Sequence, residues 1–305
     1  MRILVTGGAG FIGSHVAQAY LDAGHEVHIL DSLATGHREN VPAGAVLHEA
    51  DMLSPQAAEV FAAVRPEIVN HHAAQASVKV STNDAVHDLT QNGGGTARIC
   101  ALAVEFGVQK LIYASTGGAL YGEPEYLPVD EAHVIKPLSN YGNSKRVGEL
   151  YVDLYARQHG LRATILRYAN AYGPRQDPRG EAGVIAIFTG LMIAGQPCTI
   201  DGDGEQQKDY VYVADLARAN VDALRVGDGL AINLGTGRGI SVNEIHRALS
   251  TATGSALPAK FGPPRPGDVR NIWLESFLAE RVLGWRPEVE FDEGIAATVA
   301  WARGA

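Results

Sequence analysis

A tyrosine and a lysine four residues apart, in Tyr141-Gly142-Asn143-Ser144-Lys145, are the first residues whose spacing suggests chemistry. If this segment is helical, the two side chains lie on one face, one turn apart. A phenol has a pKa of about 10 and is a poor base at neutral pH, but a neighbouring ammonium favours the phenolate. Such a tyrosine can take a proton from a sugar hydroxyl, which would make Tyr141 a base assisted by Lys145. Taken alone, however, the spacing favours a surface tyrosine beside an exposed lysine, because many helices contain it by chance.

A glycine-rich turn lies near the start of the chain, in Thr6-Gly7-Gly8-Ala9-Gly10-Phe11-Ile12-Gly13. It follows an apolar run and opens a helical pattern, which is the context of a turn that binds the pyrophosphate of a dinucleotide. Glycines allow a tight turn and close approach of the backbone, while the helix N-terminus supplies N–H donors. The predicted contacts are Gly7, Gly10, Phe11, Ile12 and Gly13. Beside such a motif, a catalytic tyrosine and lysine become the favoured interpretation.

Two carboxylates follow later apolar runs. Asp31 lies 18 residues beyond Gly13, where it could accept hydrogen bonds from the adenosine ribose and repel a 2′-phosphate. This position predicts NAD in preference to NADP, with a cap or turn aspartate as the alternative. Asp51, with Met52 behind it, could meet the adenine ring, or it could be an ordinary aspartate at the end of a strand.

The first half of the chain alternates short apolar runs with helical patterns, which indicates βαβ units. The runs are apolar on both faces, as expected for a covered parallel sheet. We therefore predict an α/β fold, a Rossmann-type doubly wound parallel sheet. The expected strands are 2–6, 26–30, 46–49, 68–71, 110–114 and 162–167, and the expected helices are 11–23, 55–64, 84–106 and 141–159.

After Arg167 the chain becomes richer in Gly, Pro and Asp, which predicts a smaller α/β substrate domain. We expect a NAD-binding domain over 1–169 and a nucleotide-sugar-binding domain over 170–305. A helix at 213–225 and a strand at 232–235 suggest that residues of about 211–236 rejoin the first domain. Three glycines at 93–95 interrupt the third helical pattern. They indicate either a frayed or kinked helix entry, which we favour, or a very close packing contact.

Composition excludes several classes of protein. The chain has 305 residues, a net charge of −9 and two distant cysteines, and no apolar run approaches the ~20 residues that span a bilayer. Nucleic acid and membrane are therefore unexpected partners, and no metal site is predicted. The segment before the first glycines is too short for a secretory signal, so a cytoplasmic location is expected.

The sequence resembles the extended short-chain dehydrogenase/reductase family over essentially its whole length, and most of all the UDP-glucose 4-epimerase branch. This resemblance implies that Tyr141 deprotonates the sugar 4-hydroxyl while the carbon 4 hydride moves to NAD. The keto sugar then turns over and receives the hydride on its other face. Besides the residues above, the matching motifs are His71-His72-Ala73-Ala74, Asn92, Ser115-Thr116-Gly117-Gly118-Ala119-Leu120-Tyr121-Gly122, Arg167-Tyr168-Ala169-Asn170, Lys208-Asp209-Tyr210-Val211 and Arg265-Pro266-Gly267-Asp268.

The resemblance also implies which residues contact the ligands. NAD would be held tightly, with Lys145 on the nicotinamide ribose and further contacts from Ala73, Asn92 and Tyr168. Asn170 and Arg265 would bind the phosphates of a UDP-sugar. Helices 84–106 and 141–159 would form a four-helix bundle in a homodimer. The full set of expected substrate contacts is Thr116, Tyr141, Asn170, Val184, Thr199, Asp201, Lys208, Arg265 and Asp268.

Four positions depart from the family pattern. Gly117 stands where a Ser or Thr usually bonds the sugar 4-hydroxyl, and Thr116 is the expected catalytic substitute, through a bridging water if needed. Lys208 replaces an arginine near the phosphates, and Asp201 replaces an aromatic residue near the nucleobase. Ile272 stands where a large residue excludes N-acetylated sugars and a small one admits them.

Several functions therefore stay open. The favoured one is UDP-glucose/UDP-galactose interconversion. The alternatives are a UDP-N-acetylhexosamine 4-epimerase, an NAD-dependent sugar dehydrogenase and a non-catalytic NAD-sensing module. Nucleotide-sugar dehydratases are disfavoured, because Gly117-Gly118 replace the Asp-Glu pair on which those enzymes depend.

Overall fold

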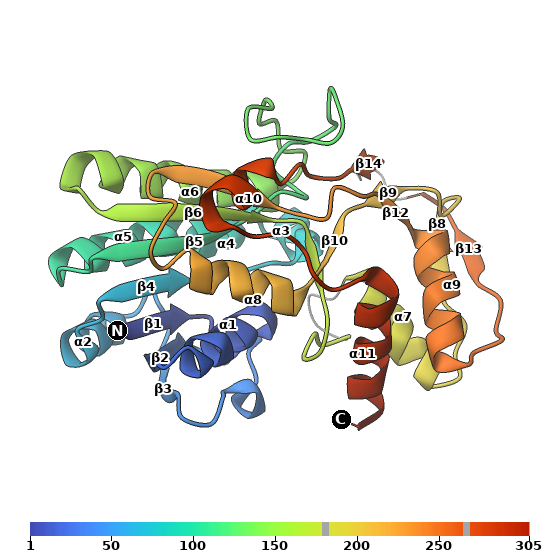
Figure 1. Cartoon of the computed structure of the whole chain (residues 1–305), viewed down its shortest axis with the longest axis horizontal. Helices are drawn as coiled ribbons and strands as arrows, with labels where there is room; N and C mark the ends of the chain where they lie inside the picture. Colours follow the sequence, from blue (N-terminus) through green and yellow to red (C-terminus); the bar gives the residue numbers. More distant parts are fainter. Residues whose placement is uncertain (179–182, 265–268, 305) are drawn as a thin grey trace.

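A seven-stranded parallel sheet forms the larger part of the molecule (Figure 1). The computed structural model describes residues 1–178, 183–264 and 269–304. All neighbouring strands are parallel, so the predicted doubly wound sheet is confirmed. Across the sheet the order is β11 (Leu230–Leu234), β6 (Arg162–Tyr168), β5 (Lys110–Thr116), β4 (Ile68–His71), β1 (Arg2–Thr6), β2 (Glu26–Asp31) and β3 (Val46–Glu49).

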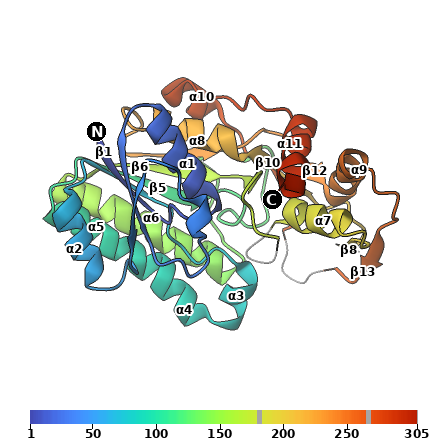
Figure 2. The ribbon, with the colours of Figure 1, turned by 90° about the horizontal axis from the view of Figure 1, so that it is seen from below.

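Helices cover both faces of this sheet, as Figure 2 shows. Successive residues of a strand point to opposite faces. On β1, Ile3 and Val5 pack into one apolar core and Leu4 into the other. The first core is covered by α1 (Phe11–Asp22), α8 (Val213–Asp222) and α10 (Phe277–Leu283), and the second by α2 (Gln56–Val64), α5 (Gly95–Glu105) and α6 (Asn140–His159).

The order of strands reverses beside β1, and this reversal positions the site. From β1 the chain turns to α1 on one face, whereas from β4 it passes to α5 on the other. The loops that follow these two neighbouring strands therefore separate at the carboxyl edge of the sheet. Ligands of open α/β sheets bind in the crevice that such a reversal leaves.

The smaller part of the molecule packs α7 (Val184–Ile193), α9 (Val242–Thr253) and α11 (Phe291–Gly304) around a third apolar core (Figure 1). Ser241 and Glu244 begin α9 with a capping box. Because β11 pairs with β6, the chain returns to the main sheet within its second half. The domain boundary at 169/170 stays a prediction. The short strands are β7 (Asn170–Tyr172), β8 (Thr199–Asp201), β9 (Gln207–Lys208), β10 (Tyr210–Tyr212), β12 (Ile240–Ser241), β13 (Lys260–Gly262) and β14 (Asn271–Ile272).

The glycine-rich part of the third helical pattern differs from the favoured expectation. After α3 (Val78–Asn83), the predicted helix 84–106 consists of α4 (Ala85–Leu89), a π-helical turn over Thr90–Gly94 and α5. The turn continues α4 into α5, so a frayed entry is wrong, whereas a kinked entry is not contradicted because π-helical turns are sites at which helices kink. A Cβ on Gly93 would lie 2.8 Å from Val147 Cγ1, and one on Gly95 would lie 2.4 Å from Met52 Cε. Close packing, the other alternative, is confirmed.

Candidate active site

One cavity of about 1920 Å³ extends from the carboxyl edge of the main sheet into the smaller part. Among the described residues, every predicted catalytic, cofactor and substrate contact except Asn92 lines it, and Ile272, predicted to affect which sugars are admitted, does not line it either. Arg265 and Asp268 lie outside the described residues. The lining set contains Gly7, Gly10, Phe11, Ile12, Gly13, Asp31, Asp51, Met52, Ala73, Thr116, Tyr141, Lys145, Tyr168, Asn170, Val184, Thr199, Asp201 and Lys208.

The glycine turn after β1 forms a cradle that excludes side chains. Gly7 has a φ of +70°, and a Cβ there would lie 2.6 Å from the Ala73 backbone nitrogen. A Cβ on Gly13 would lie 2.2 Å from the Gly7 carbonyl oxygen. Gly10 is the N-cap of α1, so the first N–H groups of that helix are available to an anion at the cavity wall.

Asp31 and Asp51 both hold the loops that follow their strands. Asp31 Oδ2 accepts from Ala9 N at 2.9 Å, and Oδ1 accepts from Leu33 N at 2.9 Å. Asp51 Oδ1 accepts from Leu53 N at 2.8 Å. Because a carboxylate oxygen has two lone pairs, these turn contacts leave Asp31 able to accept bonds from a ribose as well.

Asn92 is placed behind the cavity wall. Its Oδ1 accepts from Gln75 N at 2.9 Å, and its Nδ2 donates to Gln75 O at 2.9 Å and to Ser144 Oγ at 2.9 Å. Gln75 lines the cavity, whereas Asn92 does not. In this structure Asn92 therefore holds the loop after β4 against the start of α6, and its side chain does not line the cavity.

Tyr141 and Lys145 occupy the first turns of α6. Ser139 begins this helix because its side chain accepts from Gly142 N. Lys145 is 4% exposed, and burial lowers its pKa to about 8, while the charges of Glu149 and Asp88 oppose that shift. The lysine is thus an ammonium that titrates only slightly above neutral pH.

Thr116 provides a hydroxyl on the wall of the cavity that Tyr141 and Lys145 also line. Thr116 Oγ1 accepts from Ala119 N at 3.3 Å, and the residue lines the cavity. A Cβ on Gly117 would lie 2.3 Å from Leu274 Cδ1, in the buried core. A serine or threonine at 117 would therefore clash with Leu274 on this backbone.

His72 and Tyr168 leave a donor beside the cavity that the described residues do not use. Tyr168 Oη accepts from Asn220 Nδ2 at 2.8 Å and lies 3.1 Å from His72 Nε2. Burial, helped by the Lys145 charge, lowers the pKa of His72 to about 3, so its ring is neutral. When the Tyr168 hydroxyl donates to Nε2, the ring proton is on Nδ1, which has no partner among the described residues. Such a group fits a wall built for a polar ligand.

The substrate residues predicted from the second half come from several short elements. Asn170 on β7 donates from Nδ2 to Asp209 O at 3.1 Å, and Lys208 on β9 donates to Val269 O. Ile272 lies beside Lys208 in register on β14, but it is buried and does not line the cavity. It can therefore influence the size of the site only through its neighbours.

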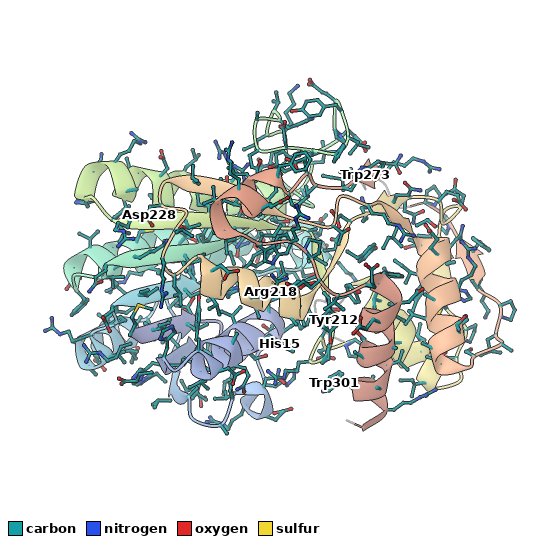
Figure 3. All side chains as sticks on the ribbon, viewed as in Figure 1. His15, Tyr212, Arg218, Asp228, Trp273 and Trp301 are labelled. Carbon is teal, nitrogen blue, oxygen red and sulfur yellow. The ribbon has the colours of Figure 1, made fainter. Side chains whose placement is uncertain are left out.

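Sequence reasoning identified a loop near 172–176 but gave it no role at the site; residues 173–177 bridge the two parts of the molecule. Arg175, with a φ of 69°, donates to Ser14 Oγ at 3.2 Å and lines the cavity. His15 lies at this junction (Figure 3), with Nε2 3.0 Å from Pro174 O. His37 Nε2 lies 3.6 Å from Asp177 Oδ2. The glycine and proline here indicate a loop, but nothing in the sequence identifies its partners on α1.

In the part of the chain that the structure describes, no helix combines the length and apolarity needed to span a bilayer. Over the same ranges, no three His, Cys, Asp or Glu side chains cluster in a way that could hold a metal ion.

Comparisons with known proteins show which proteins this chain is similar to. A model of the NAD dependent epimerase/dehydratase family matches residues 3–235. A UDP-glucose 4-epimerase of Mycolicibacterium smegmatis is 41% identical over 309 residues, covering 99% of both chains. A crystal structure of UDP-glucose 4-epimerase from Thermotoga maritima with UDP-glucose has a TM-score of 0.98 and 44% identity, covering 100% of this chain and 99% of that one. The Thermus thermophilus enzyme in complex with NAD has a TM-score of 0.96 and 46% identity, covering 100% of both.

Proposed function

This chain belongs to the NAD dependent epimerase/dehydratase family, and we propose that it interconverts UDP-glucose and UDP-galactose by inversion at carbon 4 of the sugar. One observation carries the proposal. Tyr141, Lys145 and Thr116 line the same cavity as the glycine cradle and the Asn170 and Lys208 residues.

The residues that would hold NAD fit that cofactor, because the cradle excludes side chains and its helix start offers N–H groups. When bound, NAD supplies a reversible hydride acceptor. The pyrophosphate would lie on the glycine turn, the adenosine ribose on Asp31, and the adenine near Asp51 and Met52. Lys145, Ala73 and Tyr168 would contact the nicotinamide half.

Proton transfer falls to Tyr141. Its phenolate accepts the proton of the sugar 4-hydroxyl as carbon 4 loses its hydride, and it returns the proton to the 4-oxygen when the hydride comes back on the other face. The ammonium of Lys145 favours the phenolate electrostatically. The Thr116 hydroxyl bonds the 4-oxygen and fixes its direction, either directly or through one water.

The nucleoside diphosphate is the part of the substrate that the chain binds most extensively. Asn170 and Lys208 bind its phosphates, and Val184, Thr199 and Asp201 lie along its uridine. Because most of the binding energy falls on this half, the keto sugar can turn over without leaving. Glu123, the nearest acidic residue beyond the Gly117-Gly118 pair, accepts from Arg270 N at 3.1 Å and does not line the cavity, so it supplies no acid for dehydration.

A substrate panel without added NAD tests the function. The purified chain should convert UDP-galactose to UDP-glucose catalytically and carry bound nucleotide, with little turnover of UDP-N-acetylhexosamines. Turnover that requires added NAD and consumes it stoichiometrically would instead identify a dehydrogenase. No turnover of any UDP- or dTDP-sugar would support a binding module.

Thr116→Val should lower kcat about tenfold to a hundredfold while KM changes less than threefold, because the hydroxyl acts on the reacting oxygen and not on the diphosphate. Steady-state kinetics with UDP-galactose measure both values. Thr116→Ser, which keeps the hydroxyl, is the matched control and should retain most of the activity. Equal kcat values for the Val variant and the unchanged chain would refute the role.

We also propose a homodimer through a four-helix bundle built by α4, α5 and α6. Four apolar side chains on α4 and α6 are exposed, namely Val86 (76%), Leu89 (48%), Leu150 (50%) and Tyr151 (37%). A second copy that places the same face against them would cover them symmetrically.

The cytoplasmic location stays a prediction.

Val86→Asp should convert the dimer to a single chain of 32.3 kDa, because it would bury an unpaired charge in the interface. Light scattering after gel filtration measures the mass. Phe277→Asp, at a side chain on α10 that is 74% exposed, is the control and should leave the mass of the dimer unchanged. A single chain before any substitution would exclude the bundle.

A further inference from the structure

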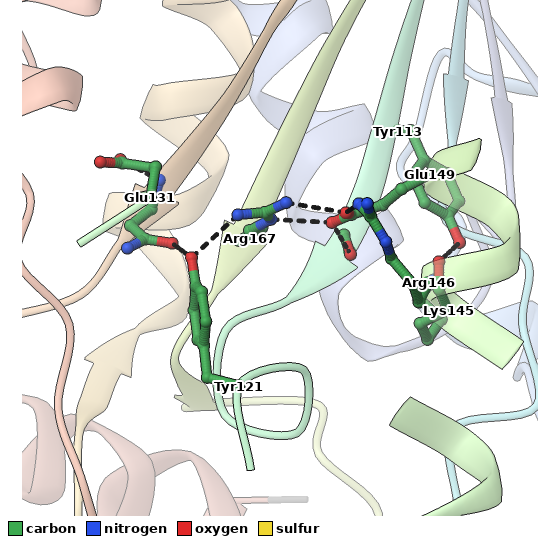
Figure 4. Close-up of polar contacts among 9 residues, drawn as sticks. Tyr113, Tyr121, Glu131, Lys145, Arg146, Glu149 and Arg167 are labelled. Atoms are coloured by element: carbon green, nitrogen blue, oxygen red, sulfur yellow. Dashed lines mark hydrogen bonds and ion pairs between the residues drawn. The ribbon is translucent and has the colours of Figure 1, made fainter. Parts of the chain in front are cut away.

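The ring of Tyr113 lies beneath the Lys145 ammonium. Lys145 Nζ is 4.5 Å from the centre of this ring, which is buried on β5 (Figure 4). Tyr113 Oη also donates to the Lys145 carbonyl oxygen at 3.3 Å. One tyrosine thus contacts both the backbone and the charged end of the same lysine.

Neighbouring residues fix the ring in this place. Gly148 lies on α6 above the phenol, and a Cβ there would be 2.2 Å from Tyr113 Oη. The His71 ring lies 5.7 Å away, centre to centre, and His71 Nε2 is 3.2 Å from Thr96 Oγ1. Any side chain at 148 would push the ring away from the helix, so a glycine at this position is what allows the contact with Lys145.

The two carboxylates whose charges raise the Lys145 pKa bond to other side chains. On its own helix, both oxygens of Glu149 accept from Arg167, at 2.9 and 2.8 Å. Asp88, from α4, accepts on Oδ1 from Gln75 Nε2 at 2.6 Å and from Asn92 Nδ2 at 3.1 Å, and its Oδ2 is buried without a hydrogen-bond partner among the described residues. Within the described residues, Lys145 forms no ion pair.

Two further titratable groups around the ammonium, His71 and His72, bring no negative charge. His71 and His72, at the end of β4, are buried, and their pKa values are lowered, first by burial and then by the Lys145 charge, so both rings are neutral. Tyr141 lies one turn earlier on α6, and its phenolate is the proposed base. The negative face of the Tyr113 ring, 4.5 Å from Nζ, therefore adds to the charges of Glu149 and Asp88 in stabilising this cation.

We propose that Tyr113 is a positioning residue for the Tyr141/Lys145 pair, and that its ring face holds the ammonium at the cavity wall and keeps it protonated. The inference rests on the proposed function, because the pair matters only if Tyr141 is the base. A cation over an aromatic face is stabilised enough to move a lysine pKa by about half a unit to one unit. Loss of the ring's negative face should therefore lower the pH at which Lys145 loses its proton.

Fluorination of the ring at 113 tests the interaction between the ring face and the Lys145 ammonium, because it changes the charge of the ring face while the shape of the side chain stays nearly the same. Tyr113→Phe keeps the negative face, whereas trifluorophenylalanine at 113 removes most of it. The chain has six lysines, so the Lys145 signal can be followed by carbon NMR of labelled lysine and assigned with Lys145→Arg. With NAD bound, the pKa of Lys145 in the phenylalanine variant should equal that in the unchanged chain. In the fluorinated variant the pKa of Lys145 should be about half a unit to one unit lower. The alkaline limb of kcat for UDP-galactose should move by the same amount, with KM unchanged.

A matched control removes the effect of fluorination itself. Trifluorophenylalanine at Phe61, a buried ring in the same core on α2, should leave both the Lys145 titration and the pH profile unchanged. Equal Lys145 titrations for the phenylalanine and trifluorophenylalanine variants at 113 would overturn the inference. The NMR titration needs no turnover. A fluorination-dependent shift in a chain that epimerises nothing would therefore uphold the contact and refute the proposed reaction instead.

Discussion

Tyr141→Phe should lower kcat for UDP-galactose by about 10²- to 10⁴-fold, because the variant keeps the ring and loses the group that carries the proton. NAD content and UDP affinity should stay within about twofold of the unchanged chain. The glycine cradle, Lys145 and the residues along the nucleoside diphosphate are all retained. Coupled steady-state assays, absorbance of the cofactor released on denaturation and calorimetric titration with UDP measure the three quantities.

Tyr155→Phe is the control for this experiment. Tyr155 lies on the same helix, outside the cavity, and its ring packs 5.1 Å from that of His159. Its loss of a hydroxyl should leave kcat unchanged. If Tyr141→Phe also retained full sugar inversion, Tyr141 would not be the base, and the proton would have to move through Thr116 or water.

The pH dependence of the unchanged chain follows from Lys145. Burial lowers its pKa to about 8, so the ammonium that favours the Tyr141 phenolate is present below that pH and lost above it. The ammonium is therefore the group whose loss limits kcat on the alkaline side.

Apolar runs in the sequence predicted the strands closely, because a strand covered on both faces needs continuous apolar residues. The glycines at 93–95 show the limit of that reasoning. Their reason lies in contacts with Val147 and Met52, which come from two other parts of the chain. A glycine that makes room for a distant side chain looks the same in sequence as one that ends a helix.

The sequence likewise predicted some residues of the candidate site and not others. Residues at the carboxyl ends of strands, such as Asp31 and Tyr168, line the cavity as expected, because the carboxyl ends of parallel strands share one edge. Asn92 and Ile272 do not, since the direction of a side chain depends on the packing around it. Arg175 was missed because its partner, Ser14, is 161 residues away.

Glu149→Gln should cost about 3–5 kcal/mol of unfolding free energy at pH 7, because it leaves Arg167 as a buried charge without its counter-ion. Both oxygens of Glu149 accept from Arg167, and Oε1 also accepts from Ser115 Oγ at 2.7 Å (Figure 4). Arg167 donates in turn to Tyr121 Oη at 2.9 Å. The network joins the helix that carries Tyr141 to strands β5 and β6, so the loss should appear in urea unfolding and also as a lower kcat.

The pH dependence of this loss has a definite sign. Burial alone would raise the pKa of Glu149, but the bonds from Arg167, Ser115 and Arg146 lower it overall. A carboxylate with a lowered pKa adds stability above its unfolded pKa of about 4.3 and loses that contribution as the pH falls through the folded value. The stability difference between the unchanged chain and Glu149→Gln should therefore be constant from pH 8 to about 5 and shrink at lower pH.

The double variant Glu149→Leu/Arg167→Met distinguishes two quantities. One is the net contribution of the ion pair to stability, and the other is the cost of leaving one buried charge without its partner. Apolar residues of similar size leave no charge to bury, so this variant should unfold at higher urea concentration than Glu149→Gln. Its kcat should nevertheless stay low, because the helix then packs on the strands without the hydrogen bonds that fix its position. A double variant with full activity would mean that packing alone positions Tyr141 and Lys145, and that the buried ion pair contributes only to stability.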